Sequence, residues 1–242
     1  MLLLCSFSLQ VFAQKKAIAQ KPVIDTSVLG KWPSVGGAAI SNDGKYVCYT
    51  INNQPVGSHT LVVQSTEGDW KREFVNASGA VFTDDSRKVV FSMTGDSLCL
   101  LSLGTNTLES IPHVRSFQLA GKGQGEWLAY QTKDATNELV LTNLATGKEK
   151  RFASVDNYLF SHKGNVCAIT QHGLDSGHAY SLLWVDLLKD NKRTIWKGDK
   201  VSYFVFDEQG SQLAFMADEK ENGQNANAIW YYEKGMETAE YC

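Results

Sequence analysis

The 242-residue sequence predicts an all-β fold built from five copies of one four-stranded unit. Three observations support this. A polar turn followed by an apolar run recurs at intervals of about 40 residues. Each such hairpin is followed by another apolar segment, a second turn and a weaker strand. No segment shows a sustained apolar period of about 3.6 residues, so little helix is expected. Hydrophobic residues make up 43% of the chain, which is sufficient for a packed core.

The clearest copy of the first hairpin is I-S-N-D-G-K-Y-V-C-Y-T, residues Ile40 to Thr50. Asn, Asp and Gly tolerate the positive φ of tight turns, so this stretch predicts two strands joined by a short turn. The turn residue recurs as Gly44, Ser86, Gly125, Gly164 and Gly210. Five positions after each turn residue, an apolar residue ends the following strand, and we call it the closing residue. The closing residues are Tyr49, Phe91, Tyr130, Ile169 and Phe215. We expect them to pack between neighbouring sheets.

The third strand of each unit is predicted at Thr60–Ser65, Ser97–Leu103, Glu138–Leu144, Ser181–Leu187 and Ala228–Glu233. Four short antiparallel strands in about 40 residues are typical of a blade of a β-propeller with WD-repeat-like turns. One sheet alone can bury neither face, whereas stacking sheets buries both. The predicted blades are 35–75, 78–113, 115–153, 155–198 and 201–242. A β-sandwich also has short, regularly spaced strands, but it does not require one turn at a fixed period. About five blades predict an incomplete ring.

The N-terminus differs in composition from the repeats. Leu2–Ala13 is apolar but too short to span a bilayer. Val11-Phe12-Ala13 resembles the pattern that precedes signal-peptide cleavage. We therefore expect a signal peptide at 1–14, a polar spacer at 15–22, and a propeller at 23–242 in a periplasmic or secreted protein with no membrane span after cleavage. An apolar N-terminal strand and a lipoprotein cysteine at Cys5 are the alternatives.

Charge and cysteine usage restrict the partners. The formal net charge is −3, which gives no basic footprint for nucleic acid and no polybasic membrane patch. Cys48, Cys99 and Cys167 lie inside apolar strand patterns and form no C-x-x-C pair, which argues against a zinc site.

No segment carries a recognisable catalytic motif. A nucleophile elbow needs G-x-S-x-G, and the nearest strings, Gly95–Cys99 and Gly173–Gly177, do not fit and precede no helical pattern. Three further candidates are weaker. His162, His172 and His178 lack the compact spacing of metal ligands, and the polar insertion at Asp218–Asn227 lacks the alternation of a calcium loop. Asp84 and Asp85 are adjacent acids that are expected to form a turn. We predict no catalytic, cofactor-binding or metal-ligating residue. Trp127, Trp184 and Trp230 are expected in the core.

The turn copies resemble the S-P-D-G-K-x-apolar-A-aromatic motif of secreted bacterial propellers, here S-N-D-G-K-Y-V-C-Y and, degraded, T-D-D-S-R-K-V-V-F and D-E-Q-G-S-Q-L-A-F. Ile24–Ile51, in which Trp32-Pro33 leads into the first turn, resembles the start of the propeller in the prolyl oligopeptidase family of serine peptidases. It is most similar to exported bacterial dipeptidyl or acylaminoacyl peptidases. The resemblance covers Val23–Cys242.

This resemblance implies a seven- or eight-bladed propeller followed by a C-terminal α/β-hydrolase domain that carries the Ser-Asp-His triad. The propeller would cap the active site and filter peptide substrates by size. The sequence departs from that pattern in having about five blades and no hydrolase domain. The first hypothesis is therefore a non-catalytic propeller portion, truncated before the catalytic domain and inactive alone, whose partners are the hydrolase domain and the peptide substrates.

Two other hypotheses remain. The chain could be a self-contained periplasmic binding or scaffold module, in which Val23–Val28 adds a strand that closes the ring. An enzyme with its site on the propeller axis would need carboxylates on the innermost strands. The innermost segments (G-G-A-A-I, G-A-V-F, Y-L-F and Y-F-V-F) carry none.

Overall fold

The computed structural model describes residues 26–121, 126–175, 178–221 and 224–242. The predicted signal peptide (1–14), the spacer (15–22) and the turn residue Gly125 lie outside these ranges. The chain divides into two compact units, Met1–Trp32 and Pro33–Cys242. In the first unit the described residues form a short 3-10 helix, η1 (Thr26–Lys31). The expectation of a closing strand at Val23–Val28 is therefore wrong from Thr26 onward, because a 3-10 turn satisfies its backbone locally and offers no strand edge.

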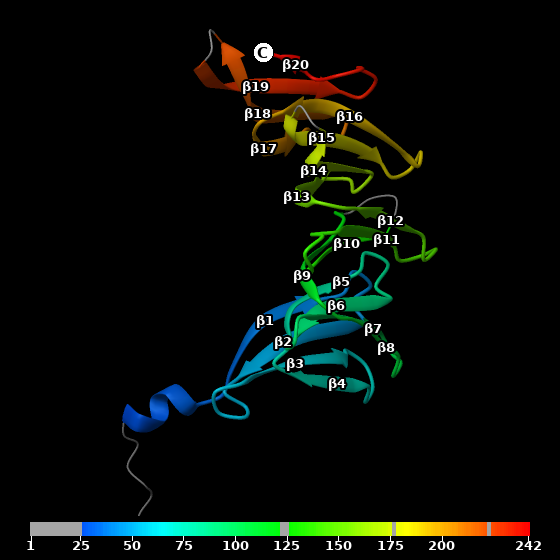
Figure 1. Ribbon diagram of the computed structural model, residues 1–242. Coiled ribbons are helices and arrows are strands. Elements are labelled where there is room, and N and C mark those ends of the chain that lie inside the picture. The colour runs from blue at the N-terminus through cyan, green and yellow to red at the C-terminus, as the bar shows by residue number, and fades with distance from the viewer. Residues whose placement is uncertain (1–25, 122–125, 176–177, 222–223) are drawn as a thin grey trace, which may run out of the picture. The chain divides into compact units, whose positions relative to one another are not determined.

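The second unit consists of five four-stranded antiparallel sheets that follow one another in chain order (Figure 1). This confirms the predicted fold class. The first sheet contains β1 (Ser34–Ile40), β2 (Tyr46–Asn52), β3 (His59–Ser65) and β4 (Lys71–Val75). The second contains β5 (Ser78–Phe82), β6 (Lys88–Met93), β7 (Ser97–Ser102) and β8 (Leu108–Ile111). The third contains β9 (Val114–Leu119), β10 (Trp127–Thr132), β11 (Leu139–Asn143) and β12 (Glu149–Phe152).

The fourth sheet contains β13 (Val155–Phe160), β14 (Val166–Asp175), β15 (His178–Asp186) and β16 (Asn191–Gly198). The fifth contains β17 (Val201–Phe206), β18 (Gln212–Glu221), β19 (Gln224–Glu233) and β20 (Glu240–Tyr241). In every sheet each strand pairs with its neighbours in sequence. No helix in the described part of the chain is long and apolar enough to cross a membrane.

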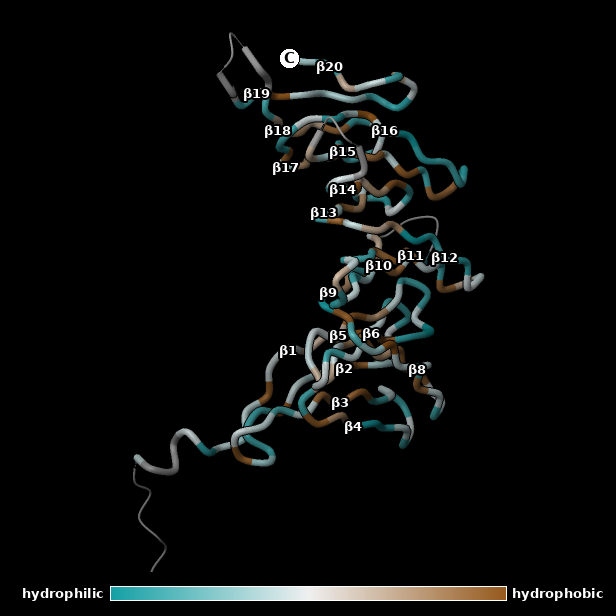
Figure 2. The backbone as a smooth tube through the Cα atoms, in the orientation of Figure 1, coloured by the Kyte–Doolittle hydropathy of each residue, from teal (hydrophilic) through white to brown (hydrophobic). Residues whose placement is uncertain are grey.

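The core consists of four clusters of buried apolar side chains, each shared by two consecutive sheets. Residues alternate between these clusters along the strands. In β6, Val89 and Phe91 belong to the cluster shared with the first sheet, whereas Val90 belongs to the cluster shared with the third. Each inner sheet therefore buries both of its faces, as stacked repeats require. Figure 2 shows hydrophobic colour along the strands and hydrophilic colour at the turn between β15 and β16.

In the second to fifth sheets, the closing residue of the second strand faces the preceding sheet. Phe91, Tyr130, Ile169 and Phe215 are buried in the clusters shared with the first, second, third and fourth sheets, as predicted. The prediction is wrong for Tyr49. This residue is half-buried, belongs to none of the four clusters, and donates a hydrogen bond from its hydroxyl to Gln64 Oε1 at 3.2 Å. Its face is directed away from the second sheet, and no cluster of the described residues joins the first sheet to an earlier one.

The predicted polar insertion at Asp218–Asn227 is also corrected. Apart from residues 222–223, which the structure does not describe, this segment extends β18 and β19, and Asp218 pairs with Asn227. Strand pairing uses backbone groups, so two polar segments joined by a turn can continue a hairpin without an apolar face.

Candidate functional site

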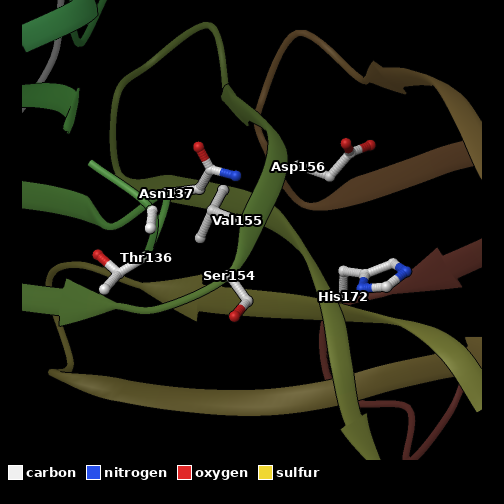
Figure 3. A pocket seen from close by; sticks show the side chains of 7 residues that line it. Thr136, Asn137, Ser154, Val155, Asp156 and His172 are labelled. Carbon is white, nitrogen blue, oxygen red and sulfur yellow. The ribbon is translucent and has the colours of Figure 1, made fainter. Parts of the chain in front are cut away.

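A hollow of about 280 Å³ lies where the third and fourth sheets meet, and we call it the junction hollow (Figure 3). The loop between β10 and β11 contributes Ala135, Thr136 and Asn137. Ser154 comes from the connection into the fourth sheet, Val155 and Asp156 are the first residues of β13, and β14 contributes His172. The hollow is thus built where a connection between sheets passes beside a hairpin loop, the kind of position at which loops carry function.

Backbone hydrogen bonds between the two sheets fix its walls. The Ser154 amide donates to the Thr136 carbonyl at 2.9 Å, and the Val155 amide donates to the Asn137 carbonyl at 3.0 Å. The His172 amide donates to the Ser154 carbonyl at 2.8 Å. Asn137 and Ser154 both have positive φ, 43° and 54°, which bends the chain enough to bring these groups together. The hollow is therefore held by backbone geometry.

The loop is braced further by Asp134. Its Oδ1 accepts hydrogen bonds from Thr136 Oγ1 at 2.5 Å and Thr132 Oγ1 at 3.0 Å. The hydrogen bond from Thr136 is the main reason that the pKa of Asp134 lies below its ordinary value. The lowered pKa favours the ionised form of Asp134, the form that accepts these hydrogen bonds.

The side chains of the junction hollow include a serine, an aspartate and a histidine, the residue types of a hydrolase triad. A triad needs the nucleophile, the base and the orienting acid within hydrogen-bond reach of one another. Among the described residues, no hydrogen bond joins the side chains of Ser154, Asp156 and His172. Figure 3 shows the Asp156 carboxylate directed away from the His172 ring, which instead contacts Tyr180 edge-to-face at 4.9 Å. We therefore interpret the hollow as a polar binding pocket.

Asn137 adds one observation to this interpretation. Its side-chain Oδ1 is buried and accepts no hydrogen bond from the described residues. Buried acceptors are normally satisfied, so this unpaired oxygen is an exception among the residues that line the hollow. This pocket could not be predicted from the sequence, because its polar residues come from three segments whose spacing matches no motif.

A second hollow of about 280 Å³ lies at the other end of the sheets, among the turns that join first and second strands. Its lining includes Asn42, Asp84, Glu126 and Trp127. Asn42 Nδ2 donates to Asp84 Oδ1 at 2.7 Å, and the Asp85 amide donates to Glu126 Oε1 at 2.6 Å. Burial, followed by the charges of Asp85 and Asp84, raises the pKa of Glu126.

These contacts belong to a series of turn-to-turn contacts that we call the turn ladder. The first and second sheets are also joined by the Asp43 amide, which donates to Ser86 Oγ at 3.1 Å. At the junction of the fourth and fifth sheets, Gly210 lies so close to Ser161 that a Cβ atom on the glycine would be 2.8 Å from the Ser161 Cβ. Asp84 and Asp85 therefore hold neighbouring turns together, consistent with their interpretation as turn formers.

The other sequence candidates do not come together. His162 lies in the turn before β14 and His172 near the end of that strand, while the side chain of His178 lies outside the described part. Gly95 and Asp96 form the turn between β6 and β7, with φ of 85° and 58°. Within the described ranges, no three His, Cys, Asp or Glu residues are grouped as a metal site.

The tryptophans lie as expected. Trp127 and Trp184 are buried in the clusters between the third and fourth and between the fourth and fifth sheets. Trp230 packs against the second of these clusters. These rings are part of the core, so they form no exposed aromatic binding surface.

No protein-family model and no curated protein matches this chain. Its fold is similar to the β-propeller domain of the Trilobed protease from Pyrococcus furiosus (TM-score 0.52, 12% identity, 88% of this chain and 71% of that one). A crystal structure of the eukaryotic initiation factor is also similar (TM-score 0.55, 17% identity, 86% of this chain and 54% of that one). Pyrococcus horikoshii acylaminoacyl peptidase gives a TM-score of 0.48 at 12% identity, with 88% of this chain covered, and the chain spans 39% of that peptidase. At these identities the comparisons define the fold, which is that of a β-propeller.

Proposed function

We propose that this chain is the non-catalytic propeller portion of an exported peptidase of the prolyl oligopeptidase type, where it caps an α/β-hydrolase domain and controls access to it. The observation that carries the proposal is the opening segment Ile24–Ile51, whose Trp32-Pro33 pair and S-N-D-G-K turn resemble the start of that family's propeller. The similarity to the propeller domain of the Trilobed protease supports it at the level of fold. On this proposal the chain is inactive alone and works in the periplasm or outside the cell.

The physical basis of such gating is rigidity. Four buried clusters and the turn ladder tie consecutive sheets together, and close-packed interiors do not deform continuously. A rigid stack can exclude substrates by size, because an opening lined by fixed loops does not widen to admit a folded protein. Peptide substrates would reach the hydrolase domain only if they fit that opening.

The first test is to read the genomic DNA beyond codon 242 in all three frames. Further blades followed by G-x-S-x-G and a later Asp and His would support the proposal. A clean terminator, with no propeller or hydrolase sequence in any frame, would contradict it and leave a self-contained binding module as the hypothesis to examine.

The second test uses the restored longer product and the 242-residue chain side by side. We expect the longer product to cleave short chromogenic peptides and to spare unfolded polypeptides of protein size, while the 242-residue chain cleaves neither. The matched control replaces the serine of the restored G-x-S-x-G motif by alanine. Equal cleavage of peptides and large polypeptides by the longer product would refute the gating role.

A further inference from the structure

We propose that the interface between the third and fourth sheets binds a tetrahedral dianion, a phosphate ion or a phosphate group, through Lys148, Lys150 and Lys192. The site is a pocket of about 290 Å³ lined by residues of β12, β15 and β16, and we call it the lysine pocket. Among the residues that the structure describes, none lines both this pocket and the junction hollow. The proposal does not depend on the proposed peptidase function.

Strand pairing directs two of the lysines toward each other. Lys150 pairs with Leu141 in the third sheet, and Lys192 pairs with Val185 in the fourth. Directly paired residues occupy the same face of a sheet. Leu141 and Val185 both belong to the buried cluster between these two sheets. The two ammonium groups therefore approach one interface from opposite sides, where like charges repel each other.

The carboxylate in this pocket is shared by two lysines. Lys148 Nζ and Lys150 Nζ both form ion pairs with Asp190, in the turn between β15 and β16 that is hydrophilic in Figure 2. Lys192 Nζ lies 5.8 Å from the centroid of the Phe152 ring, and no carboxylate of the described residues forms an ion pair with it. Three ammonium groups and one carboxylate leave an excess of two positive charges, which a dianion would balance.

The neighbouring Arg151 belongs to a separate group of charges. It pairs with Val140, which lies in the cluster between the second and third sheets, so its side chain occupies the opposite face of the third sheet. There its guanidinium forms ion pairs with Glu138 at 2.7 Å and Glu149 at 2.8 Å. These charges do not neutralise the lysines on the other face.

Lys150 is the least solvated of the three lysines, with a side chain that is 16% exposed. Burial, followed by the charges of Lys148 and Lys192, lowers the pKa of Lys150. Phe152 and Val185 supply an apolar wall beside it. Hydrogen bonds between charged groups are stronger where water is partly excluded, so a bound dianion would offset both the burial and the repulsion.

Two other junctions place a single cation at the position equivalent to Lys150. By strand register these residues are Arg72 in the first sheet and Arg193 in the fourth. Arg72 Nη1 donates to Asn106 Oδ1 at 2.8 Å, and Arg193 Nη1 donates to the Met236 carbonyl at 2.9 Å. Each guanidinium is thus bound by the outer turn of the next sheet. At the lysine pocket the same turn instead supplies one carboxylate to two lysines, so the excess charge is particular to this junction.

The test follows the backbone amides of the full 242-residue chain by two-dimensional NMR while inorganic phosphate is added at constant ionic strength. The titration is done at about pH 8, where phosphate is largely a dianion. Perchlorate is the control ion, because it has the same tetrahedral shape with a single charge. Glycerol 2-phosphate distinguishes a free ion from a phosphate group carried on a larger molecule.

Four variants accompany the parent chain. Lys150→Met and Lys192→Met each remove one ammonium group and keep an unbranched side chain. Lys189→Met is the matched control, because it removes the same charge from an exposed residue next to Asp190 that does not line the pocket. Asp190→Asn removes the competing carboxylate at a φ of 56°, which asparagine tolerates. Far-UV circular dichroism shows whether each variant retains its sheet content.

We expect phosphate to shift the amides of Lys150, Asn191 and Lys192 in a saturable manner, and perchlorate to shift them little. Lys150→Met and Lys192→Met should each weaken phosphate binding about tenfold. Lys189→Met should change it less than about twofold, and Asp190→Asn should strengthen it. Equal affinity for glycerol 2-phosphate would identify a phosphate group on a larger molecule as a ligand, and much weaker affinity would identify the free ion. Either result supports the anion site.

Three results would overturn the proposal: no saturable shift with phosphate, equal shifts with perchlorate, or unchanged phosphate affinity in a folded Lys192→Met variant. If both methionine variants lose sheet content, Asp190→Asn decides, because binding no tighter than in the parent chain would contradict the role of the excess charge. None of these measurements reports hydrolysis, so they leave the peptidase proposal untouched.

Discussion

The contribution of the turn ladder to stability can be measured by comparing alanine variants of two turn glycines, Gly210 and Gly147. Gly210 has a φ of 69°, and Gly147 in the turn between β11 and β12 has a φ of 72°. Replacing either by alanine imposes the left-handed conformation on a side chain, which costs about 1–2 kcal/mol. Part of this free-energy cost is offset, because alanine lowers the conformational entropy of the unfolded chain relative to glycine. We therefore expect Gly147→Ala, whose added Cβ has nothing within 4 Å, to cost about 1 kcal/mol in all.

Gly210→Ala adds a steric cost to the same conformational cost. The new Cβ would lie 2.8 Å from the Ser161 Cβ and 2.9 Å from Asn165 Oδ1. Ser161 must then move, which disturbs the hydrogen bond from Ser161 Oγ to Asn165 Oδ1 (2.8 Å) and the one from the Val166 amide to Ser161 Oγ (3.2 Å). Each bond contributes about 1 kcal/mol. The expected total is about 3 kcal/mol, roughly 2 kcal/mol more than for Gly147→Ala.

The assay is native-state hydrogen exchange at the amides of β18 in the fifth sheet and of β11 in the third, because stacked sheets unfold in parts and a single global free energy is not defined for them. Gly210→Ala should lower the opening free energy of the fifth sheet, while Gly147→Ala should leave β18 unchanged and affect only the third sheet. If the two variants lowered the stability of their own sheets by amounts within about 0.5 kcal/mol of each other, the turn contact would contribute nothing and the reasoning would fail.

Two further predictions concern carboxylates, one half-buried (Glu126) and one buried (Asp186). Because the pKa of Glu126 is raised, the folded chain favours its protonated form, and the stability that this group contributes falls as the pH rises through its folded pKa. Glu126→Gln keeps an acceptor for the Asp85 amide, so it should stabilise the third sheet at pH 8 by less than about 1 kcal/mol, with no gain at pH 4, measured by native-state hydrogen exchange at the amides of β10. A pH-independent effect would contradict this. Asp186 is buried, which opposes its ionisation, yet the hydrogen bond from Lys234 Nζ (2.8 Å) and two backbone amides lower its pKa. Its stabilising contribution is therefore present above the ordinary pKa and lost as the pH falls. Lys234→Met should cost about 2 kcal/mol at pH 7 and less at pH 3, whereas Lys189→Met, at an exposed position, should cost little at either pH.

The repeat architecture could be predicted from the sequence because each turn carries its own local signal. Gly44, Ser86, Gly164 and Gly210 all have positive φ, and the closing residue follows each at the same distance. The four inner closing residues pack between sheets because alternation along a strand fixes which face they occupy. Tyr49 carries the same signal, yet no cluster includes it, since local pattern does not report whether a neighbouring sheet is present.

The junction hollow could not be predicted in the same way. Ser154 comes from the connection between two sheets, Asp156 from the start of β13, Asn137 from a hairpin loop, and His172 from near the end of β14. Their proximity depends on backbone hydrogen bonds between two sheets, which leave no pattern in the sequence. The extended hairpin of β18 and β19 was missed for a related reason, because paired polar strands show no apolar alternation.

The alternation of strand residues between two clusters has a consequence for how this chain can change in length. In β6, inserting one residue before Val89 would turn Val89 and Phe91 toward the third sheet and Val90 toward the first, which disrupts two interfaces at once. Insertions and deletions should therefore be confined to hairpin tips and should add residues to both strands of a hairpin together. The β18–β19 hairpin, with strands of 10 residues each, is longer than the β6–β7 hairpin, with strands of 6 each, yet Leu213, Phe215 and Ala217 still face the fourth sheet. Evolutionary drift in this protein should thus appear as hairpins of variable length on a stack whose period is conserved.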